Sequence, residues 1–345
     1  MKKVLFATTA LVATAGVAAA DVAVSGGAEM GLFGGSGTET QFFTDIDVTF
    51  TMSGTTDNGL TFGAAVDLDE GGAGAAAVAN NADDGGVAIF LSGDFGTVTL
   101  GDTDGALDWA MTEAWVGNAG SINDDETGHA GALGSYLDGA YDGQILRYNN
   151  TFGDFGVAVS VEMDDTGVRD EGYAIGFRYG MDLGGGSLDL GLGYQTATYA
   201  ASGAGALTIA TVTVSDYGVV IPAAFQVEVD AIGVSAAYSM NGLSLGLAFT
   251  DFEASYLGGT GEATHLGLGV GYTMDAITVS ANYGAFDGSF VPGQIIDEVG
   301  YGLAVAYDLG GGASVHLGYG HSDLGGTHST PGTSDSWSFG VAMSF

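Results

Sequence analysis

The run Tyr173-Ala174-Ile175-Gly176-Phe177-Arg178-Tyr179-Gly180-Met181-Asp182 decides the fold, because every second residue in it is large and apolar. A β-strand has a side-chain period of two, so the apolar residues share one face and the small or charged residues share the other. The same alternation recurs at residues 60–69, 188–195, 243–249, 266–272 and 299–307. The chain is therefore expected to be all-β, with one bulky apolar face and one small or charged face.

A soluble β-sandwich would bury the apolar faces of two sheets against each other. Its outer faces would then carry row upon row of Gly and Ala, where Thr, Lys and Glu are expected. In an outer-membrane barrel the apolar face meets lipid and the small or polar face lines the lumen, with aromatic girdles at the interfaces. Tyrosines near strand ends fit such girdles, namely Tyr148, Tyr179, Tyr194, Tyr238, Tyr272, Tyr283, Tyr307 and Tyr319. The sequence thus favours a transmembrane antiparallel up-and-down β-barrel.

Connections between these segments alternate between short Gly-containing or Asn-Gly turns and longer links. Seven short turns and eight longer links predict about 16 strands, the first from Asp21 to about Phe33 and the last from Ser334 to Phe345. Residues 207–214 also alternate weakly inside one longer link, so the count is good to about two strands. The longer links are expected at residues 34–40, 70–86, 103–143, 163–171, 200–228, 257–262, 287–297 and 322–334.

Residues 1–20 have the features of a signal peptide, with Lys2 and Lys3 ahead of an apolar segment and an Ala-rich cleavage site. A signal peptide predicts that the protein is exported, and residues 21–345 form one predicted barrel domain. No apolar run long enough for a transmembrane helix follows the signal, so a membrane form of this chain would be a closed barrel. The chain has no Cys, which leaves no disulfide or thiol chemistry.

Acidic residues dominate the charge of the mature chain. Three Arg stand against 42 Asp and Glu once the two signal-peptide lysines are removed, a formal charge of −39. Such a field repels nucleic acid and anionic lipid and attracts cations. Because 46% of all residues are hydrophobic, the acidity does not indicate disorder.

Residues 103–143 interrupt the alternation for longer than an ordinary connection. Apolar Leu107, Ala110, Met111 and Ala114 fall on one face of a predicted helix, with Asp108, Thr112 and Glu113 on the other. Asp104 is the expected cap and Gly117 the expected end of this helix. More acids follow, and the stretch contains no Lys or Arg. We expect it to fold into the barrel and narrow the pore.

Three stretches resemble the Gram-negative general porins of photosynthetic and marine alphaproteobacteria. They are residues 50–63, residues 91–102 and the end Trp337-Ser338-Phe339-Gly340-Val341-Ala342-Met343-Ser344-Phe345. The resemblance extends over the whole chain. It implies a homotrimer in the outer membrane, in contact with its lipid, and a last strand that the membrane-insertion machinery reads. The apolar row expected to act in insertion is Trp337, Phe339, Val341, Met343 and Phe345.

The resemblance also implies that the third long loop is an acidic constriction facing basic residues on the opposite wall. Here that loop is 103–143. By strand alternation Arg147 and Arg178 point into the lumen and Arg169 lies in a loop. The cluster of basic residues that would face the acidic loop is therefore nearly absent. The predicted constriction residues are Asp104, Asp108, Glu113, Asp124, Asp125, Glu126, Asp138, Asp142, Arg147 and Arg178.

Other candidate sites are few. Asp124, Asp125 and Glu126 could ligate Ca²⁺ as a structural ion, or form a charged loop without one; no cofactor is required. The five histidines show no metal-ligand spacing, and His265 and His316 are expected to be lumenal without a role. Trp109 and Trp115 fit packing within the loop better than a platform for sugars.

Three functions fit parts of this pattern. The first is a passive channel for small hydrophilic solutes that prefers cations or, as an alternative, selects a substrate. The second is an outer-membrane barrel enzyme, for which no nucleophile–base pair, phosphate loop or H-E-x-x-H motif is present. The third is a secreted, calcium-stiffened adhesive protein, whose tandem G-G-x-G-x-D repeats are lacking. The sequence predicts a non-enzymatic porin.

Overall fold

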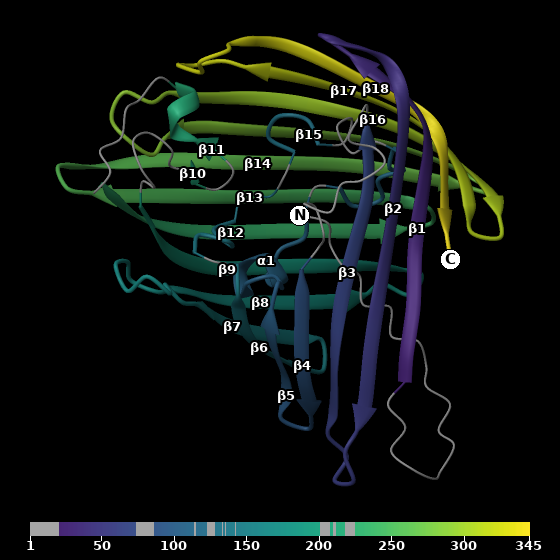
Figure 1. Ribbon diagram of the computed structural model, residues 1–345, viewed down its shortest axis with the longest axis horizontal. Helices are drawn as coiled ribbons and strands as arrows, with labels where there is room; N and C mark the ends of the chain where they lie inside the picture. The colour runs from purple at the N-terminus through teal and green to yellow at the C-terminus, as the bar shows by residue number, and fades with distance from the viewer. Residues whose placement is uncertain are drawn as a thin grey trace.

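A closed antiparallel barrel accounts for almost all of the chain (Figure 1). The computed structural model describes residues 21–73, 86–113, 115–122, 128–132, 134, 136–141, 143–200, 208–209, 212–217 and 225–345. Residues 1–20, the predicted signal peptide, lie outside this part. Among the described residues, no helix has the length and apolar character needed to span a bilayer.

The elements follow one another along the chain as the alternation predicted. They are β1 (Asp21–Gly35), β2 (Thr38–Thr55), β3 (Thr61–Ala73), β4 (Val87–Gly93), β5 (Gly96–Gly101), α1 (Ala106–Ala110), β6 (Ile145–Phe152), β7 (Phe155–Glu162), β8 (Gly172–Asp182), β9 (Gly186–Ala200), β10 (Thr208–Ile209), β11 (Val212–Thr213), the 3₁₀ turn η3 (Val214–Tyr217), β12 (Gln226–Met240), β13 (Leu243–Tyr256), β14 (Gly259–Met274), β15 (Ile277–Ser289), β16 (Ile296–Gly310), β17 (Ala313–Leu324) and β18 (Gly332–Ser344).

Sixteen of these strands form the barrel, each paired with its neighbour in sequence, and β18 closes it against β1. The closing register pairs Gly27 with Ser344 and Gly35 with Ser336. The short strands β10 and β11 pair only with each other, inside the link between β9 and β12. The predicted barrel of about 16 strands is confirmed, and the weak alternation at 207–214 is not a barrel strand.

The outer surface is an apolar belt bounded by tyrosines. On β8, Tyr173 and Tyr179 both point outward, and on β16 Tyr301 and Tyr307 do the same. The members of each pair are six positions apart, which is roughly 20 Å along a strand. Because the strands of such barrels are tilted by about 35–45°, each pair marks roughly 15 Å of a lipid-facing band that is about 25 Å tall. The belt between them exposes large aliphatic side chains, as a lipid-facing wall requires.

The turns gather at one rim and most long links at the other, as predicted. Asn241 and Gly242 have φ values of 52° and 81°, the two positive values that a tight two-residue hairpin requires. The expected long links at 34–40 and 257–262 are wrong, because β1 joins β2 through Ser36-Gly37 and β13 joins β14 through Leu257-Gly258. Here the strands keep pairing above the apolar belt, and positive φ at Gly37 and Gly258 closes the turns.

We expect deletion of Phe345 to lower the amount of barrel assembled in the outer membrane while leaving export intact. The Phe345 N–H donates to the Gly26 carbonyl at 2.9 Å, so the last residue completes the seam between β18 and β1. Its ring is 80% exposed and contributes little to packing within one chain. Membrane fractionation measures the effect. The control is Phe249→Ala, which also removes an outward ring but not at the seam; equal membrane levels for both variants would contradict the expectation.

Candidate functional site

The link between β5 and β6 lies inside the barrel and carries the helix α1, which packs on the inner faces of β7, β8 and β9. In Figure 1 this helix is seen between the strands β1–β5 that cross in front and the strands behind. Ala106, Leu107 and Ala110 are buried against the wall. Contacts continue from there around β12 to β18 and to Gly31 of β1. The predicted fold of the third long loop into the lumen is therefore confirmed for its described residues.

The predicted helix was too long. It starts after Gly105, which makes no side-chain capping bond, and ends at Ala110, since Met111 is extended. Asp104 is therefore not the cap and Gly117 not the end. The wall overrides the helical pattern: the Thr112 N–H donates to the Ser235 hydroxyl on β12 at 2.8 Å instead of to a helical carbonyl.

Arg147 and Arg178 both reach the loop. Arg147 Nη1 donates to the Asp104 carbonyl at 2.6 Å and lies 3.9 Å from the Asp104 carboxylate, and the side chain as a whole is buried. The guanidinium of Arg178 stacks over the Trp109 ring, 4.2 Å from its centroid. Both arginines, on β6 and β8, thus help to hold the loop against the wall, and the loop partly covers their charges.

The predicted acids of the loop have different surroundings. The Asp104 side chain is 46% exposed and Glu113 is half-buried, so both are close to the lumen. Asp108 is only 8% exposed. Asp124, Asp125, Glu126 and Asp142 lie outside the described residues, so a calcium site there stays a prediction.

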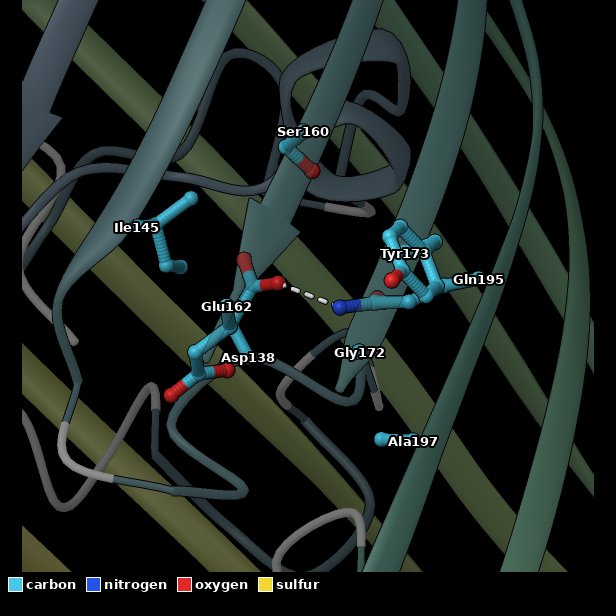
Figure 2. Close-up of a pocket in the computed structure, with 8 residues that line it drawn as sticks. All are labelled: Asp138, Ile145, Ser160, Glu162, Gly172, Tyr173, Gln195 and Ala197. Atoms are coloured by element: carbon cyan, nitrogen blue, oxygen red, sulfur yellow. Dashed lines mark hydrogen bonds between the residues drawn. The ribbon is translucent and has the colours of Figure 1, made fainter. Parts of the chain in front are cut away.

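Asp138 ties the two ends of the loop together. Its carboxylate accepts the Gly105 N–H at 2.7 Å and the Gln195 side-chain amide at 2.6 Å, the latter marked in Figure 2. Burial raises the pKa of this carboxyl from 3.8 to about 6, although both hydrogen bonds oppose that rise. Asp138 is therefore an anchor between loop and wall.

Asp138 and Gln195 line a small pocket between the loop and the wall, and Glu162, at the end of β7, lines it too (Figure 2). Its carboxylate accepts backbone N–H groups of Gly139, Tyr141 and Gly143 at 3.1–3.2 Å. Arg169, from the link between β7 and β8, donates to the Ala140 carbonyl at 2.7 Å and stacks over Tyr141. The returning end of the loop is thus held from two sides.

His265 and His316 are loop anchors, which the sequence did not indicate. His265 Nε2 lies 2.7 Å from the Gly131 carbonyl, and His316 Nδ1 lies 3.0 Å from the Gly120 carbonyl. A carbonyl only accepts, so these ring nitrogens carry the protons. The expectation that both residues have no role is wrong, because strand register places them opposite loop carbonyls that need a donor.

The lumenal face of β1–β3 is acidic. Glu29, Asp45, Asp47, Asp67 and Asp69 alternate with the outward apolar residues of these strands. Ligand oxygens of Asp45, Asp47 and Asp69 all lie within 4.8 Å of one another. Strand alternation already placed Asp67 and Asp69 on the small, polar face, but only pairing of β2 with β3 brings the three carboxylates together.

A sixteen-strand barrel with a long link folded against its inner wall is the architecture of a porin, and comparison with known proteins decides the family. The family model of Gram-negative porins matches residues 7–327. The chain is 31% identical over 313 residues to a porin of Rhodobacter capsulatus, covering 88% of this chain and 95% of that protein. The chain is a Gram-negative porin. The porin therefore resides in the outer membrane, and its family consists of channels, not enzymes.

Solved structures agree with this fold. OmpT, an outer membrane protein of Vibrio cholerae in a trimer form, superimposes on the porin with a TM-score of 0.66 at 14% identity, covering 95% of this chain and all of that one. An anion-selective porin from Comamonas acidovorans gives a TM-score of 0.62 at 14% identity, with coverage of 95% and 100%. At such identities the likeness concerns the fold alone.

We expect the porin to gain stability, relative to an Asp138→Asn variant, as the pH falls from 7.5 to 4.5. A carboxyl whose pKa is raised in the folded protein favours folding when protonated; that contribution is fully present below its ordinary pKa of 3.8 and is lost as the pH rises through about 6. Thermal denaturation in detergent at both pH values measures the difference.

Asp164 supplies a control that does not titrate in this range. Hydrogen bonds, first from the Arg169 backbone N–H, hold the pKa of Asp164 below its ordinary value of 3.8. The contribution of Asp164 is therefore lost only below about pH 3.8, and Asp164→Asn should give a profile parallel to that of wild type between pH 7.5 and 4.5. If wild type and Asp138→Asn had parallel pH profiles, Asp138 would not be the titrating anchor.

Proposed function

We propose that this porin is a water-filled diffusion channel that prefers cations, with its narrowest part between the loop of residues 103–143 and the acidic wall of β1–β3. The observation that carries the proposal is the unequal placement of charge. Asp45, Asp47 and Asp69 line one wall, whereas Arg147 on β6 and Arg178 on β8 are in contact with the loop. β2 is four strands from β6 and six strands from β8 around the barrel, so the acids and the arginines lie on separate parts of the wall.

Confinement strengthens this effect. Water between low-dielectric walls screens charges less than bulk water, so lumenal carboxylates act strongly on a passing ion. Arg147 and Arg178 can offset only part of the field, since each also interacts with the loop. Asp104 and Glu113 add negative charge from the loop side. Cations are therefore concentrated in the constriction and anions are depleted.

A saccharide-selective channel is the alternative, and the position of Trp109 argues against it. A sugar platform needs a free aromatic face, but the ring of Trp109 is stacked by the guanidinium of Arg178 and lies beside Gly156 of β7. This is the arrangement of a packing residue. The proposal is therefore a general channel for small hydrophilic solutes and ions.

Reversal potential across a planar bilayer under a salt gradient tests the charge assignment. The triple variant Asp45→Asn, Asp47→Asn, Asp69→Asn should move the reversal potential toward the neutral value with little loss of conductance. Asp104→Asn with Glu113→Gln should move it by a smaller amount, because Asp104 is already paired with Arg147. The wild-type preference should weaken as the Debye length falls from about 10 Å at 0.1 M salt to about 3 Å at 1 M.

The matched control removes three carboxylates from the outer surface: Asp251→Asn, Glu253→Gln and Asp287→Asn, which face outward on β13 and β15. This variant should keep the wild-type reversal potential. An anion-selective wild type, or equal shifts for the inner and outer triple variants, would refute the proposal.

The proposed channel is a homotrimer, and the height of the wall supports an interface between copies. A strand needs about 9–11 residues to cross the hydrocarbon core, but β4 and β5 have 7 and 6 residues, whereas β12, β13 and β14 have 15, 14 and 16. The wall at β4–β5 is too low to face lipid alone, although its outward residues Ile89 and Leu100 are apolar. Neighbouring copies in a trimer would cover it.

Ile89→Trp should therefore reduce the trimer fraction in mild detergent, while Leu247→Trp on β13 should not. A large ring is accommodated by lipid but overpacks a protein interface, at a typical cost of about 1–3 kcal/mol. Sedimentation or unheated gel mobility measures the assembly. Identical assembly of both variants would place the contact between copies elsewhere on the barrel.

A further inference from the structure

A repeated pairing of serine and glycine marks the path of the loop along the inner wall. Ser235 is directly opposite Gly191, Ser280 opposite Gly271 and Ser322 opposite Gly300, each pair on two adjacent strands. The three pairs lie on β12/β9, β15/β14 and β17/β16. In each case both residues belong to the lumenal face that the loop covers.

Each serine accepts one backbone N–H of the loop. The hydroxyl oxygens of Ser235, Ser280 and Ser322 accept from Thr112, Ala119 and Ala130, at 2.8, 2.8 and 2.9 Å. Ser160 on β7 does the same for Ala106 at 2.8 Å. The Ala106 N–H is at the start of α1 and the other three lie beyond its end, so none has a helical carbonyl as partner and each would otherwise need water.

Each opposing glycine makes room for a loop carbonyl. A Cβ at Gly191 would lie less than 3.0 Å from the Ala110 oxygen, and a Cβ at Gly271 less than 3.0 Å from the Gly117 oxygen. The carbonyl and the bound N–H are two residues apart in both cases, 110 with 112 and 117 with 119. At Gly300 a Cβ would lie less than 3.0 Å from both His129 Nδ1 and the Ala130 oxygen of the loop. The side chain of any other residue would lift the loop toward the axis.

We propose that these pairs form a track that positions the loop and sets the width of the pore, separately from the carboxylates that set its charge preference. The track is uncharged, so it fixes the distance between loop and wall without altering the field in the lumen. Ser160, Ser235, Ser280 and Ser322 hold the loop, and Gly191, Gly271 and Gly300 determine how closely it lies. Gly176 on β8 adds to them, because a Cβ there would lie less than 3.0 Å from the Ala106 oxygen, although Gly176 is not directly opposite Ser160. This inference deepens the proposed channel function by assigning conductance to residues that do not touch the permeating ion.

Glycine variants test the distance. Gly191→Ala and Gly271→Ala should each lower single-channel conductance, because the new methyl group meets loop backbone that can move only into the lumen. Their reversal potential under a salt gradient should equal that of wild type. The control is Gly180→Ala on the lumenal face of β8, where a Cβ would meet only the Asp189 carboxylate at 3.2 Å. Wild-type conductance in both loop-facing variants would overturn the proposal.

Serine variants test the attachment and remain informative if a glycine variant fails to assemble. Losing one such hydrogen bond shifts the equilibrium between attached and detached loop by about 5-fold. Ser235→Ala, Ser280→Ala and Ser322→Ala together should increase open-channel current noise and add conductance levels above the main one. The control is Ser92→Ala, whose hydroxyl bonds to Thr97 on β5 and not to the loop.

Three results separate this proposal from the channel's charge preference. Equal current noise in the triple serine variant and Ser92→Ala would overturn the track. A reversal potential that moved together with conductance would overturn the separation of width from charge. A wild-type porin without cation preference would refute the proposed selectivity, but the conductance differences among these variants would still support the track.

Discussion

Backbone hydrogen bonding governs this molecule at two levels. In hydrocarbon every N–H and C=O must be paired within the protein, which only a closed ring of strands achieves for a β chain. The β1–β18 seam meets this requirement through the register from Gly27–Ser344 to Gly35–Ser336. The same requirement then applies inside the barrel, where a loop without a partner strand must satisfy its backbone groups on the wall.

The wall meets that second requirement with side chains instead of a ladder. Hydroxyls, carboxylates and an amide accept loop N–H groups, while His265, His316 and Arg147 donate to loop carbonyls. Because these groups come from strands around most of the ring, the loop follows the inner surface instead of standing free in the lumen. The glycine-rich lumenal face, which looks featureless in sequence, is what allows this close approach.

The attachment of the loop to the wall also affects which charged side chains face the lumen. Arg147 on β6 and Arg178 on β8 contact the loop around α1, and the acids on β1–β3 face the lumen. The fold itself does not dictate selectivity, since an anion-selective porin from Comamonas acidovorans shares it. In the proposed channel, selectivity depends on where the charged side chains of the wall lie relative to the loop, which the path of the loop decides.

Strand alternation and the order of short and long connections determined the all-β class, the barrel, the face that meets lipid and the number of strands to within about two, because these patterns need only local sequence. Composition and position also marked residues 103–143 as the insert that enters the lumen. Helix length, the short links at 34–40 and 257–262, and the roles of Asp138, His265 and His316 required the tertiary structure. Each depends on which residues face each other across strands or across the lumen, over separations such as the 123 positions between Thr112 and Ser235. Local propensity determines the strands, whereas closure of the ring decides which side chains meet the loop.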